Sequence, residues 1–444
     1  MEVIVIGAGI SGLAAARELS KAGVETIVLE ARDRIGGRIH TIHDERVGIP
    51  IELGAEFVHG DPPEILDLAK EAGLGVVKTR GKSWFLDQRG ELAPSGDEPP
   101  GSDDELWNIA RSYIDEHKPD ISLAEFLGLP ITAAVSDGEK EWVKRFVSGF
   151  HAAEPAKVGI YELIETQDAE ESINGITSHR IREGYSRLAD FLQLSSQQSG
   201  AKFFFDNIVT SIDWDNRPVR VRARSVDGQN FFYEGSAAIV TLPVGVLKRS
   251  MGSENHVNFS PEIDQKRSIL DRIEMGCARR VTLAFKEKWW IESLSTIDRS
   301  KADLGFLFGQ NVPISVWWAD ETSNAATVTG WIGGPKAIEM EKLEDEQFID
   351  IAVTSLSRIF GLGESALESH LIEGFTYDWH GDPFSCGAYT YMGVGGADAP
   401  SRLAEPLSGR LYFAGEATSN GHWGTVHGAI ASGLRAAREI LETL

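Results

Sequence analysis

The N-terminal segment constrains the fold most, because it joins an apolar strand, a glycine-rich turn and a helix in the order of a nucleotide-binding unit. Residues 3–6 form an unbroken apolar run, which is typical of a parallel strand buried on both faces. Gly7, Gly9 and Gly12 follow it directly. The first glycine permits a tight turn, the second lets the backbone approach a pyrophosphate, and the third lets the helix at residues 12–22 pack on the strand. The sequence therefore predicts a nucleotide at the start of that helix.

The next stretch supplies a group for the ribose of that nucleotide. Gly23 is placed to end the helix, and residues 25–29 form a second apolar strand. Glu30 ends this strand at about the spacing from the glycines that reaches a ribose hydroxyl pair. These residues together predict a dinucleotide-binding unit.

A second glycine pair then separates the candidate dinucleotides. Gly36 and Gly37 provide another close backbone approach, and Arg38 supplies a fork-shaped cation that suits a pyrophosphate. This combination favours FAD. The alternative is NADP, with Arg32 beside Glu30 meeting a ribose phosphate.

The composition excludes several classes of protein. The chain has 444 residues, of which 42% are hydrophobic, which suits two domains. No apolar run approaches the roughly eighteen residues of a membrane span, and the chain opens directly on its first strand, so we expect no membrane anchor and a cytoplasmic location. Only Cys277 and Cys386 are present, so we expect no metal site. The formal charge of −24 argues against nucleic acid and is compatible with a cationic small molecule.

Further along, a short strand at residues 51–60 carries small residues and two polar ones. Gly54 and Ala55 are small enough for the backbone to lie against a flat ring, and Glu56 and His59 follow as candidates for contact with a substrate. A helix is predicted at residues 63–74, and residues 90–104 have the composition of a surface loop.

The middle of the chain is first mainly helical and then rich in predicted strands. Residues 105–195 have helical periodicity with almost no strand signal, which indicates a different domain. The sequence predicts further strands at 202–205, 208–214, 219–223, 237–242, 280–285, 314–319 and 326–332, with a helix at 344–360.

The C-terminal stretch repeats the arrangement of strand, glycine turn and helix. Residues 410–414 form a strand, Gly415 and Glu416 turn out of it, and residues 426–444 form an amphipathic helix. The start of that helix presents free N–H groups and a positive dipole end. Beside a flavin, it would stabilise negative charge on the pyrimidine carbonyl of the reduced ring.

Six blocks of sequence resemble the flavin-containing amine oxidases, the family of monoamine oxidases, polyamine oxidases and lysine-specific histone demethylases, in a soluble, bacterial-type form. The blocks occur in the order of that family and run from residue 4 to residue 437: IVIGAGISGLAAA, LEARDRIGGR, ELGAEFVHG, IVTLPVGVLK, DWHGDPFSCGAYTY and FAGEATSNGHWGTVHGAIASGLRAA.

The resemblance implies FAD contacts along the whole chain. It implies a cofactor set of Gly7, Gly9, Ser11, Gly12, Glu30, Ala31, Arg32, Gly36, Gly37, Arg38, Gly54, Ala55, Glu56, Phe57, Val209, Trp379, Gly415, Glu416, Gly424, Thr425, Val426 and Ala429. It implies a catalytic set of His59, Arg280, Tyr389, Trp423 and Thr425, in which Tyr389 forms one wall of an aromatic cage that orients the amine.

Three positions depart from the pattern of the family. Ala388 stands where monoamine oxidases carry the cysteine that bonds to FAD, so the flavin is expected to be noncovalent. Thr425 replaces the usual second tyrosine of the cage, with Trp423 nearby as a substitute. Arg280 stands where most members place a lysine that holds a water at flavin N5, and this affects the expected reaction with oxygen.

The expected function is oxidation of an amine by hydride transfer to flavin N5, giving an imine, then a carbonyl compound and, with oxygen, hydrogen peroxide. Alternatives are an L-amino acid oxidase, an amine dehydrogenase with another electron acceptor and, from a different class, a flavin isomerase or sensor without net redox chemistry. The expected partners are the amine and the acceptor, with no nucleic acid and no membrane. A homodimer is a further hypothesis.

The expected fold is α/β, with a Rossmann-like FAD-binding domain of the two-dinucleotide-binding-domain flavoprotein type and an interleaved α+β substrate-binding domain. We assign residues 1–78, 196–249 and 385–444 to the FAD-binding domain, and residues 79–195 and 250–384 to the substrate-binding domain.

Overall fold

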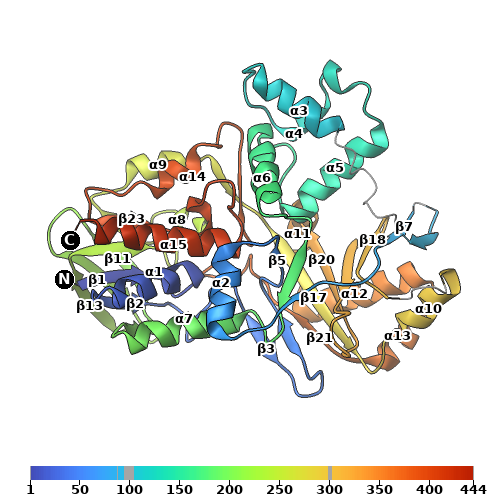
Figure 1. The fold of residues 1–444 in the computed structure, drawn as a ribbon, viewed down its shortest axis with the longest axis horizontal. Helices are drawn as coiled ribbons and strands as arrows, with labels where there is room; N and C mark the ends of the chain where they lie inside the picture. The colour runs from blue at the N-terminus through green and yellow to red at the C-terminus, as the bar shows by residue number, and fades with distance from the viewer. Residues whose placement is uncertain (1, 88, 95–104, 299–302, 444) are drawn as a thin grey trace.

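A five-stranded parallel sheet forms the centre of one half of the protein. The computed structural model describes residues 2–87, 89–94, 105–298 and 303–443 (Figure 1). The sheet has the strand order β10-β2-β1-β14-β23. The order turns back at β1, because β2 pairs with one of its edges and β14 with the other. Its strands are β1 (Glu2–Ile6), β2 (Glu25–Leu29), β10 (Lys202–Phe204), β14 (Ala237–Val240) and β23 (Leu411–Phe413).

The apolar run of β1 is explained by two cores, one on each face of this sheet. Val3 and Val5 pack toward the helices, and Ile4 and Ile6 pack toward a second sheet. The helical layer consists of α1 (Ile10–Lys21), α2 (Pro63–Ala72), α7 (Ser186–Gln198) and α15 (Val426–Leu441). The second sheet has the order β13-β12-β11-β15, from β11 (Ile208–Asp213), β12 (Val219–Arg224), β13 (Asn230–Gly235) and β15 (Asn258–Ser260).

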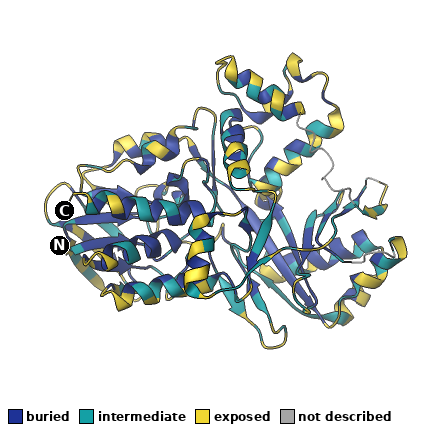
Figure 2. Cartoon of the chain, in the orientation of Figure 1, coloured by how far each residue is buried: buried dark blue, intermediate teal, exposed yellow. Residues whose placement is uncertain are grey.

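The other half of the protein is built on a seven-stranded sheet with the order β21-β17-β20-β19-β18-β7-β8. Figure 2 shows its central strands as buried as those of the parallel sheet. Its strands are β7 (Trp84–Leu86), β8 (Leu92–Pro94), β17 (Ala278–Phe285), β18 (Phe306–Gly309), β19 (Val316–Ala319), β20 (Thr327–Gly333) and β21 (Leu371–Thr376). The helices of this half are α10 (Trp290–Ile297), α11 (Pro335–Glu339), α12 (Asp345–Phe360) and α13 (Glu364–His370).

Alternation along these strands separates a core face from a second face. Val281 and Leu283 of β17 pack into a core with the α12 residue Phe348. Arg280 and Thr282 alternate with them and therefore lie on the other face of the sheet. That second face is the one that contributes to the site described below.

A group of helices with little strand structure lies above the seven-stranded sheet in Figure 1. It contains α3 (Glu105–Asp115), α4 (Leu123–Leu127), α5 (Asp137–Phe150) and α6 (Ile160–Ser172), and the one nearby strand β9 (Ser178–Ile181) follows it. The helical periodicity of residues 105–195 therefore predicted this region correctly. The predicted loop at 90–104 falls partly on β8, and its residues 95–104 lie outside the described residues.

The remaining elements are short. They are β3 (Thr41–His43), β4 (Pro50–Glu52), β5 (Val58–His59), β6 (Val76–Lys78), β16 (Ile273–Met275), β22 (Thr390–Met392), α8 (Val244–Leu247), α9 (Asp264–Leu270) and α14 (Ala399–Ala404). Among them, α8, α9 and α14 pack in the core of the half with the parallel sheet. The predicted strand at 51–60 is two pieces, β4 and β5, separated by the small residues Gly54 and Ala55.

The division into two domains stays a prediction, and the packing of α7 bears on where its boundary lies. Leu188 and Leu192 of α7 share a core with Val3 and Val5 of the parallel sheet, so α7 packs with the nucleotide-binding half although the predicted boundary lies at residue 195. The reason is that the short N-terminal helix α1 needs apolar neighbours on its open side, and α7 supplies them.

Candidate active site

The turn after β1 has the geometry of a phosphate cradle. Gly7 has a φ of +109°, which a side chain would strain. A Cβ on Gly12 would lie 2.0 Å from the Gly7 carbonyl oxygen, so this glycine permits the close packing of α1 on the turn. A Cβ on Gly9 would meet no atom within 4 Å, so the backbone here faces open space. Gly9 also precedes α1 without a capping side chain, which leaves the first N–H groups of the helix available to an anion.

The second glycine turn lies against the first. Gly36 donates from its N–H to the Ala8 carbonyl at 2.9 Å, and Gly37 has a φ of +60°. A Cβ on Gly37 would lie 3.2 Å from the Cα of Gly9. The two turns that the sequence separated by about two dozen residues therefore form one glycine-lined surface.

Glu30 lies at the end of β2, where the sequence predicted it, and is only 5% exposed. Its carboxylate accepts hydrogen bonds from the backbone N–H groups of Ala8, at 2.7 Å, and Arg32, at 2.9 Å. Burial raises the pKa of this carboxyl group above its usual range. The Arg32 guanidinium pairs with Asp382 at 2.6 Å and so is held by an acid of this chain, which removes the observation on which the NADP alternative depended.

A narrow cleft with about 20 Å³ of free volume lies at the carboxyl ends of β14 and β23. Arg38, Thr241, Gly415 and Glu416 are among the residues that line it. This is the edge at which parallel sheets of this kind bind their ligands, beside the strand where the order turns back. The predicted contacts Arg38, Gly415 and Glu416 therefore converge on one cleft.

Within the cleft, Arg38 connects the nucleotide turn to the segment before β22. Its Nη1 donates to Glu416 Oε1 and to the Ala388 carbonyl, both at 2.8 Å. The other oxygen of Glu416 accepts from Thr390 Oγ1 at 2.6 Å and from the Gly424 N–H at 2.9 Å. These bonds place Ala388, and therefore Tyr389, at the edge of the cleft.

The start of α15 closes the same region. Thr425 is the N-cap, and its Oγ1 accepts from the Gly428 N–H at 3.0 Å and donates to the His422 carbonyl at 2.6 Å. The helix begins at Val426, as predicted. Close to β1, the Ser11 and Ser432 hydroxyls lie 3.1 Å apart, which ties α1 to α15.

Gly54 lies in close contact with the Arg38 backbone and the Trp379 ring. A Cβ on Gly54 would lie 1.9 Å from the Arg38 carbonyl oxygen and 3.1 Å from the Trp379 ring. The Trp379 Nε1 donates to the Leu53 carbonyl at 2.8 Å. The small residue is required here because the Arg38 backbone and the Trp379 ring both occupy the space of a side chain.

Arg280 lies on the second face of the seven-stranded sheet and is held in a buried ion pair. Its Nη2 donates to Glu56 Oε2 at 2.7 Å and its Nη1 to the Gly54 carbonyl at 2.9 Å, and the residue is 4% exposed. The other oxygen of Glu56 accepts from Arg180 Nε at 2.8 Å and from Trp318 Nε1 at 3.0 Å. Although burial opposes ionisation, the charges of Arg180 and Arg280 hold the pKa of Glu56 below its usual value.

Tyr389 faces an aromatic residue that sequence reasoning missed. The Trp331 ring lies parallel to the Tyr389 ring, with an interplanar angle of 10° and ring centroids 6.4 Å apart. Both rings are fixed by the end of α5, because the Tyr389 hydroxyl donates to the Phe150 carbonyl at 2.5 Å and Trp331 Nε1 donates to the Gly149 carbonyl at 2.8 Å. The signal that could have found Trp331 is its place in an alternating strand, directly opposite Arg280 in the ladder.

Trp423, predicted as a substitute for the second cage residue, lies elsewhere. It is 5% exposed, packs in the core behind the parallel sheet, and donates from Nε1 to Glu162 Oε1 at 2.9 Å. The ring parallel to Tyr389 is that of Trp331.

His59 contacts the aromatic residues of this region. Its ring lies 5.8 Å from Phe57 and 5.5 Å from Phe150, between centroids. Burial lowers the pKa of His59 to about 4, so the imidazole is neutral near pH 7. A neutral imidazole keeps one lone pair that can accept a proton or a hydrogen bond.

The remaining predicted contacts are distributed around the cleft. Ala31 follows β2, Val209 lies in β11 of the second sheet, and Ala429 lies in the first turns of α15. No group of three or more His, Cys, Asp or Glu side chains that could hold a metal ion occurs in the part of the chain that the structure describes.

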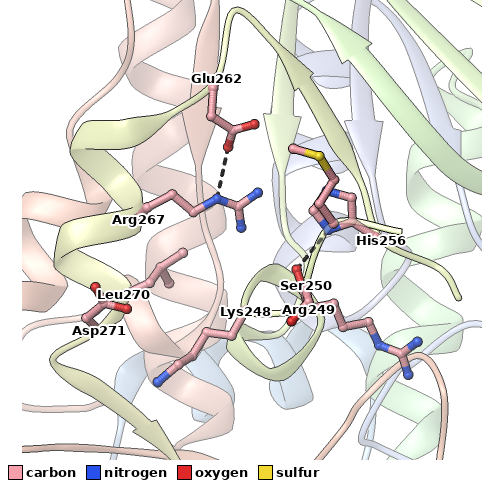
Figure 3. Close-up of a pocket in the computed structure, with 9 residues that line it drawn as sticks. Lys248, Arg249, Ser250, His256, Glu262, Arg267, Leu270 and Asp271 are labelled. Carbon is pink, nitrogen blue, oxygen red and sulfur yellow. Dashed lines mark hydrogen bonds and ion pairs between the residues drawn. The ribbon is translucent and has the colours of Figure 1, made fainter. Parts of the chain in front are cut away.

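A separate surface hollow of about 300 Å³ lies away from all of these residues (Figure 3). In it the Arg267 guanidinium pairs with Glu262 at 2.9 Å, opposite His256, whose Nδ1 donates to the Arg249 carbonyl at 2.8 Å. None of the predicted site residues lines it. Arg38, Gly415 and Glu416 line the cleft at the ends of β14 and β23 instead, so that cleft is the one connected with the predicted chemistry.

The residues present fit FAD. The turns at Gly7 and Gly37 leave a glycine-lined surface, the backbone at Gly9 faces open space, and the first N–H groups of α1 are free for a pyrophosphate. Gly415, at the mouth of the cleft, has a φ of +132°, and a Cβ there would meet no atom within 4 Å. A long, narrow ligand with a charged middle matches this arrangement.

Comparison with protein families gives one match over nearly the whole chain. Residues 10–441 match the family described as flavin containing amine oxidoreductase. Polyamine oxidase 4 of Oryza sativa subsp. japonica is 28% identical over 467 residues, which cover 98% of this chain and 88% of that protein. Lysine-specific histone demethylase 1 homolog 2 of the same organism is 28% identical over 99% of this chain, which spans 57% of the length of that homologue.

Solved structures share the fold. Wild-type putrescine oxidase bound to putrescine superposes with a TM-score of 0.80 at 20% sequence identity, over 100% of this chain and 99% of that one. The same arrangement of a parallel sheet and a second, mixed sheet therefore occurs in that protein. Among the described residues, no helix has the length and apolar character needed to cross a bilayer.

Proposed function

The chain belongs to the family of flavin-containing amine oxidoreductases, and from this membership we propose how its residues perform the reaction. It is an FAD-dependent enzyme that oxidises an amine. We propose that the product is an imine that hydrolyses to a carbonyl compound, and that oxygen is the electron acceptor and forms hydrogen peroxide.

The observation that carries this proposal is the parallel pair of Tyr389 and Trp331 at the edge of the nucleotide cleft. Aromatic faces attract an amine, and two parallel faces restrict its orientation. The Ala388 carbonyl is bonded to Arg38, which lines the cleft, so the pair has a fixed position relative to the cleft. An amine bound against the pair would therefore lie at the edge of the cleft.

FAD would be held by groups of the two glycine turns, of β2 and of the cleft. The first turn of α1 would take the pyrophosphate, Glu30 the ribose, and Arg38 and Glu416 the part between the pyrophosphate and the ring. Ala388 offers no sulfur to the flavin, so we propose that the cofactor is bound noncovalently.

Bound FAD supplies an acceptor for a hydride from the α-carbon of the amine. The chain supplies the setting for that transfer. Free N–H groups at the start of α15 stabilise negative charge that develops beside them. The amine must react uncharged, and the imidazole of His59, which is neutral near pH 7, adds no positive charge among the aromatic residues that would oppose binding of the amine.

Arg280 favours a second candidate, an amine dehydrogenase with an acceptor other than oxygen. A lysine at this position could exchange a proton with a water, whereas arginine stays charged. Both Nη atoms of Arg280 already donate, one to Glu56 and one to the Gly54 carbonyl, so its guanidinium has no free pair of N–H groups for a substrate carboxylate. The same contacts weigh against the L-amino acid oxidase alternative.

Two measurements test the proposal. Anaerobic mixing with amines should bleach the flavin absorbance, and admission of oxygen should then restore it with release of hydrogen peroxide. Restoration only by an artificial electron acceptor would support the dehydrogenase instead, and absence of bleaching with every amine would overturn amine oxidation. Acid precipitation should leave the yellow colour in the supernatant, and colour in the pellet would contradict noncovalent binding.

The assembly and the location are also proposals. The charge of −24 supports a small cationic partner and opposes binding to nucleic acid. We propose a cytoplasmic homodimer with the two domains as assigned above. Sedimentation equilibrium of the holoenzyme tests the dimer, and a monomeric mass would exclude it.

A further inference from the structure

The second face of the seven-stranded sheet carries a row of aromatic residues, which we call the aromatic wall, and Phe85 belongs to it by its register opposite Phe308. The wall consists of Phe85, Phe308, Phe306, Trp318 and Trp331. Each comes from a strand whose alternate residues are in the α12 core: Trp84, Leu307 and Trp317 all face that core. The centroid distances are 6.2 Å from Phe308 to Phe306, 6.0 Å from Phe306 to Trp318, and 6.5 Å from Trp318 to Trp331. Tyr389 continues the row at its inner end, 6.4 Å beyond Trp331.

Helix α5 carries a matching aromatic stripe. Trp142, Phe146 and Phe150 are spaced four residues apart and therefore share one side of the helix. The stripe meets the second face of the sheet at both ends. Trp142 lies 5.8 Å from Phe308, and the Phe150 carbonyl accepts from the Tyr389 hydroxyl.

The middle of the stripe is left without a partner from the wall. Among the described residues, the ring contacts of Phe146 are with Phe150 and His151, which belong to its own segment. Phe146 and Phe150 are each 38% exposed, and Phe306 and Phe308 are only partly buried. The rings of His59 and Phe57 connect Phe150 to the wall, because His59 lies 5.5 Å from Phe150 and Phe57 lies 5.8 Å from Phe306. The exposed ring of Phe146 and the partly buried ring of Phe308 can accept an apolar group beside them.

The charge beside the wall is already balanced. Among the described residues, the Glu56 carboxylate is hydrogen-bonded to the wall through Trp318, and its two oxygens accept from Arg180 and Arg280 as well. The carboxylate therefore has no free position for a second ammonium group. A second positive charge would lose its hydration against these rings, and cation–π attraction would offset that loss only in part while Glu56 is already paired.

We propose that the wall and the stripe hold the tail of the substrate, so that the enzyme acts on monoamines with an aryl or extended alkyl tail in preference to diamines and polyamines. This inference rests on the proposed function, in which Tyr389 and Trp331 hold the amine end. The proposed substrate preference differs from the compounds in the names of the similar proteins, which are polyamines and putrescine.

A matched pair of substrates tests the charge of the tail. Hexylamine and hexamethylenediamine have the same carbon chain and differ by one terminal ammonium group. In anaerobic stopped-flow, hexylamine should reduce the flavin at least about tenfold faster at subsaturating concentration, and phenylbutylamine should behave like hexylamine. Faster reduction by the diamine would overturn the inference while leaving amine oxidation intact. Lack of reduction by every amine would overturn the proposed function, and the inference with it.

Variants test the location of the tail. Phe306→Ala and Phe146→Ala should raise KM for hexylamine about tenfold and change kcat little, because they remove apolar contact from the tail only. KM for propylamine, which is too short to reach them, should stay unchanged. Phe232→Ala is the control, since Phe232 is 74% exposed on β13 in the other half of the protein. Because Phe146 is already exposed, its variant should fold even if Phe306→Ala does not.

An unreactive ligand gives a readout independent of turnover. Benzyltrimethylammonium lacks the nitrogen lone pair that oxidation requires, and tetramethylammonium is the same cation without the ring. Benzyltrimethylammonium should perturb the flavin spectrum of the holoenzyme at a concentration about tenfold lower, and this difference should shrink in Phe146→Ala. Equal affinity of the two ions, or an undiminished difference in the variant, would overturn the inference.

Discussion

At the scale of the residue, the proposed chemistry rests on side chains that the fold holds in one orientation. Tyr389 is fixed through its hydroxyl to the Phe150 carbonyl and through its ring beside Trp331. Arg280 is fixed through Glu56 and Gly54. In both cases the partners come from segments distant in the sequence, so a substitution tests the position of the group as well as its chemistry.

Replacement of Tyr389 should separate its ring from its hydroxyl. Tyr389→Phe keeps the aromatic face and loses one hydrogen bond, so flavin reduction should slow only slightly. Tyr389→Ala removes one wall of the pair and should slow reduction by about tenfold, on the order of 1.4 kcal/mol. Anaerobic stopped-flow measures both rates, and the flavin content shows that FAD stays bound. Equal rates in the three proteins would place Tyr389 among the structural aromatic residues.

Arg280→Lys should change the reaction with oxygen and leave the reaction with amine unchanged. Lysine can exchange a proton with a water beside the cofactor, whereas the arginine cannot deprotonate, so reoxidation of reduced flavin should become about tenfold faster. Stopped-flow mixing of the reduced enzyme with oxygen measures this rate.

The matched control is Arg180→Lys, because Arg180 binds the other oxygen of Glu56 at 2.8 Å. It alters the same ion pair from the opposite side. If reoxidation is faster in both variants, the cause is the weakened ion pair of Glu56. If it is faster in neither variant, Arg280 has no role in the reaction with oxygen.

At the scale of the element, the close packing of α1 against α15 shapes the proposed cofactor site. A Cβ on Gly433 of α15 would lie 2.1 Å from the Ser11 carbonyl oxygen in α1. The contact is therefore backbone against backbone, and it fixes both helix starts that face the cleft. An amphipathic helix at the C-terminus was predictable from its periodicity, but its contact with α1 was not.

Gly433→Ala should separate these helices. The added methyl group should lower the free energy of unfolding of the holoenzyme by about 1–3 kcal/mol and weaken retention of FAD, because the start of α15 moves with the helix. Urea denaturation with dialysis of the flavin measures both effects.

Gly363→Ala is the matched control for this substitution. Gly363 has a φ of −69°, and a Cβ there would meet no atom within 4 Å. If Gly433→Ala unfolds at the same urea concentration as the control and the wild type, the helices are less tightly packed than described.

At the scale of the whole molecule, stability depends on pH through groups buried in both halves. Burial raises the pKa of Glu52 to about 7 and that of Glu162 to about 8. Burial also lowers the pKa of His59 and His151 to about 4. The two classes act in opposite directions. The raised pKa of the buried carboxyls makes the folded state most stable at low pH, where these groups are protonated in both states. The lowered pKa of the buried histidines makes it most stable at higher pH, where they are neutral in both states.

Glu162 offers a way to isolate one of these contributions. Its carboxyl keeps a proton in the folded state that it loses in the unfolded state above pH 4.5, so stability should fall as pH rises from 4.5 to about 8. The slope from this group is at most about 1.4 kcal/mol per pH unit. Glu162→Gln preserves an acceptor for Trp423 Nε1 and should remove that slope, as measured by urea denaturation across this interval.

Glu442→Gln serves as the control, because Glu442 is exposed at the end of α15. It should leave the pH dependence of stability as in the wild type. A wild-type slope that persists in Glu162→Gln would show that Glu162 ionises in the folded protein.

The sequence by itself determined the elements and the cofactor. An apolar strand buried on both faces, glycines at the required spacing and helical periodicity are local properties, and they predicted β1, α1, β2 and α15 to within a few residues. The glycine turns carry the shape of the phosphate cradle in the backbone itself, so the pattern of residues already contained it.

Only the tertiary structure decided which side chains meet at the proposed site. Trp331 became the partner of Tyr389 because strand pairing brings β20 beside β17 and the end of α5 fixes both rings. Glu56 took Arg280 as an ion-pair partner across 224 positions of sequence. Such contacts depend on sheet register and on packing between distant segments, and these are set by the sum of many interactions that no local pattern records.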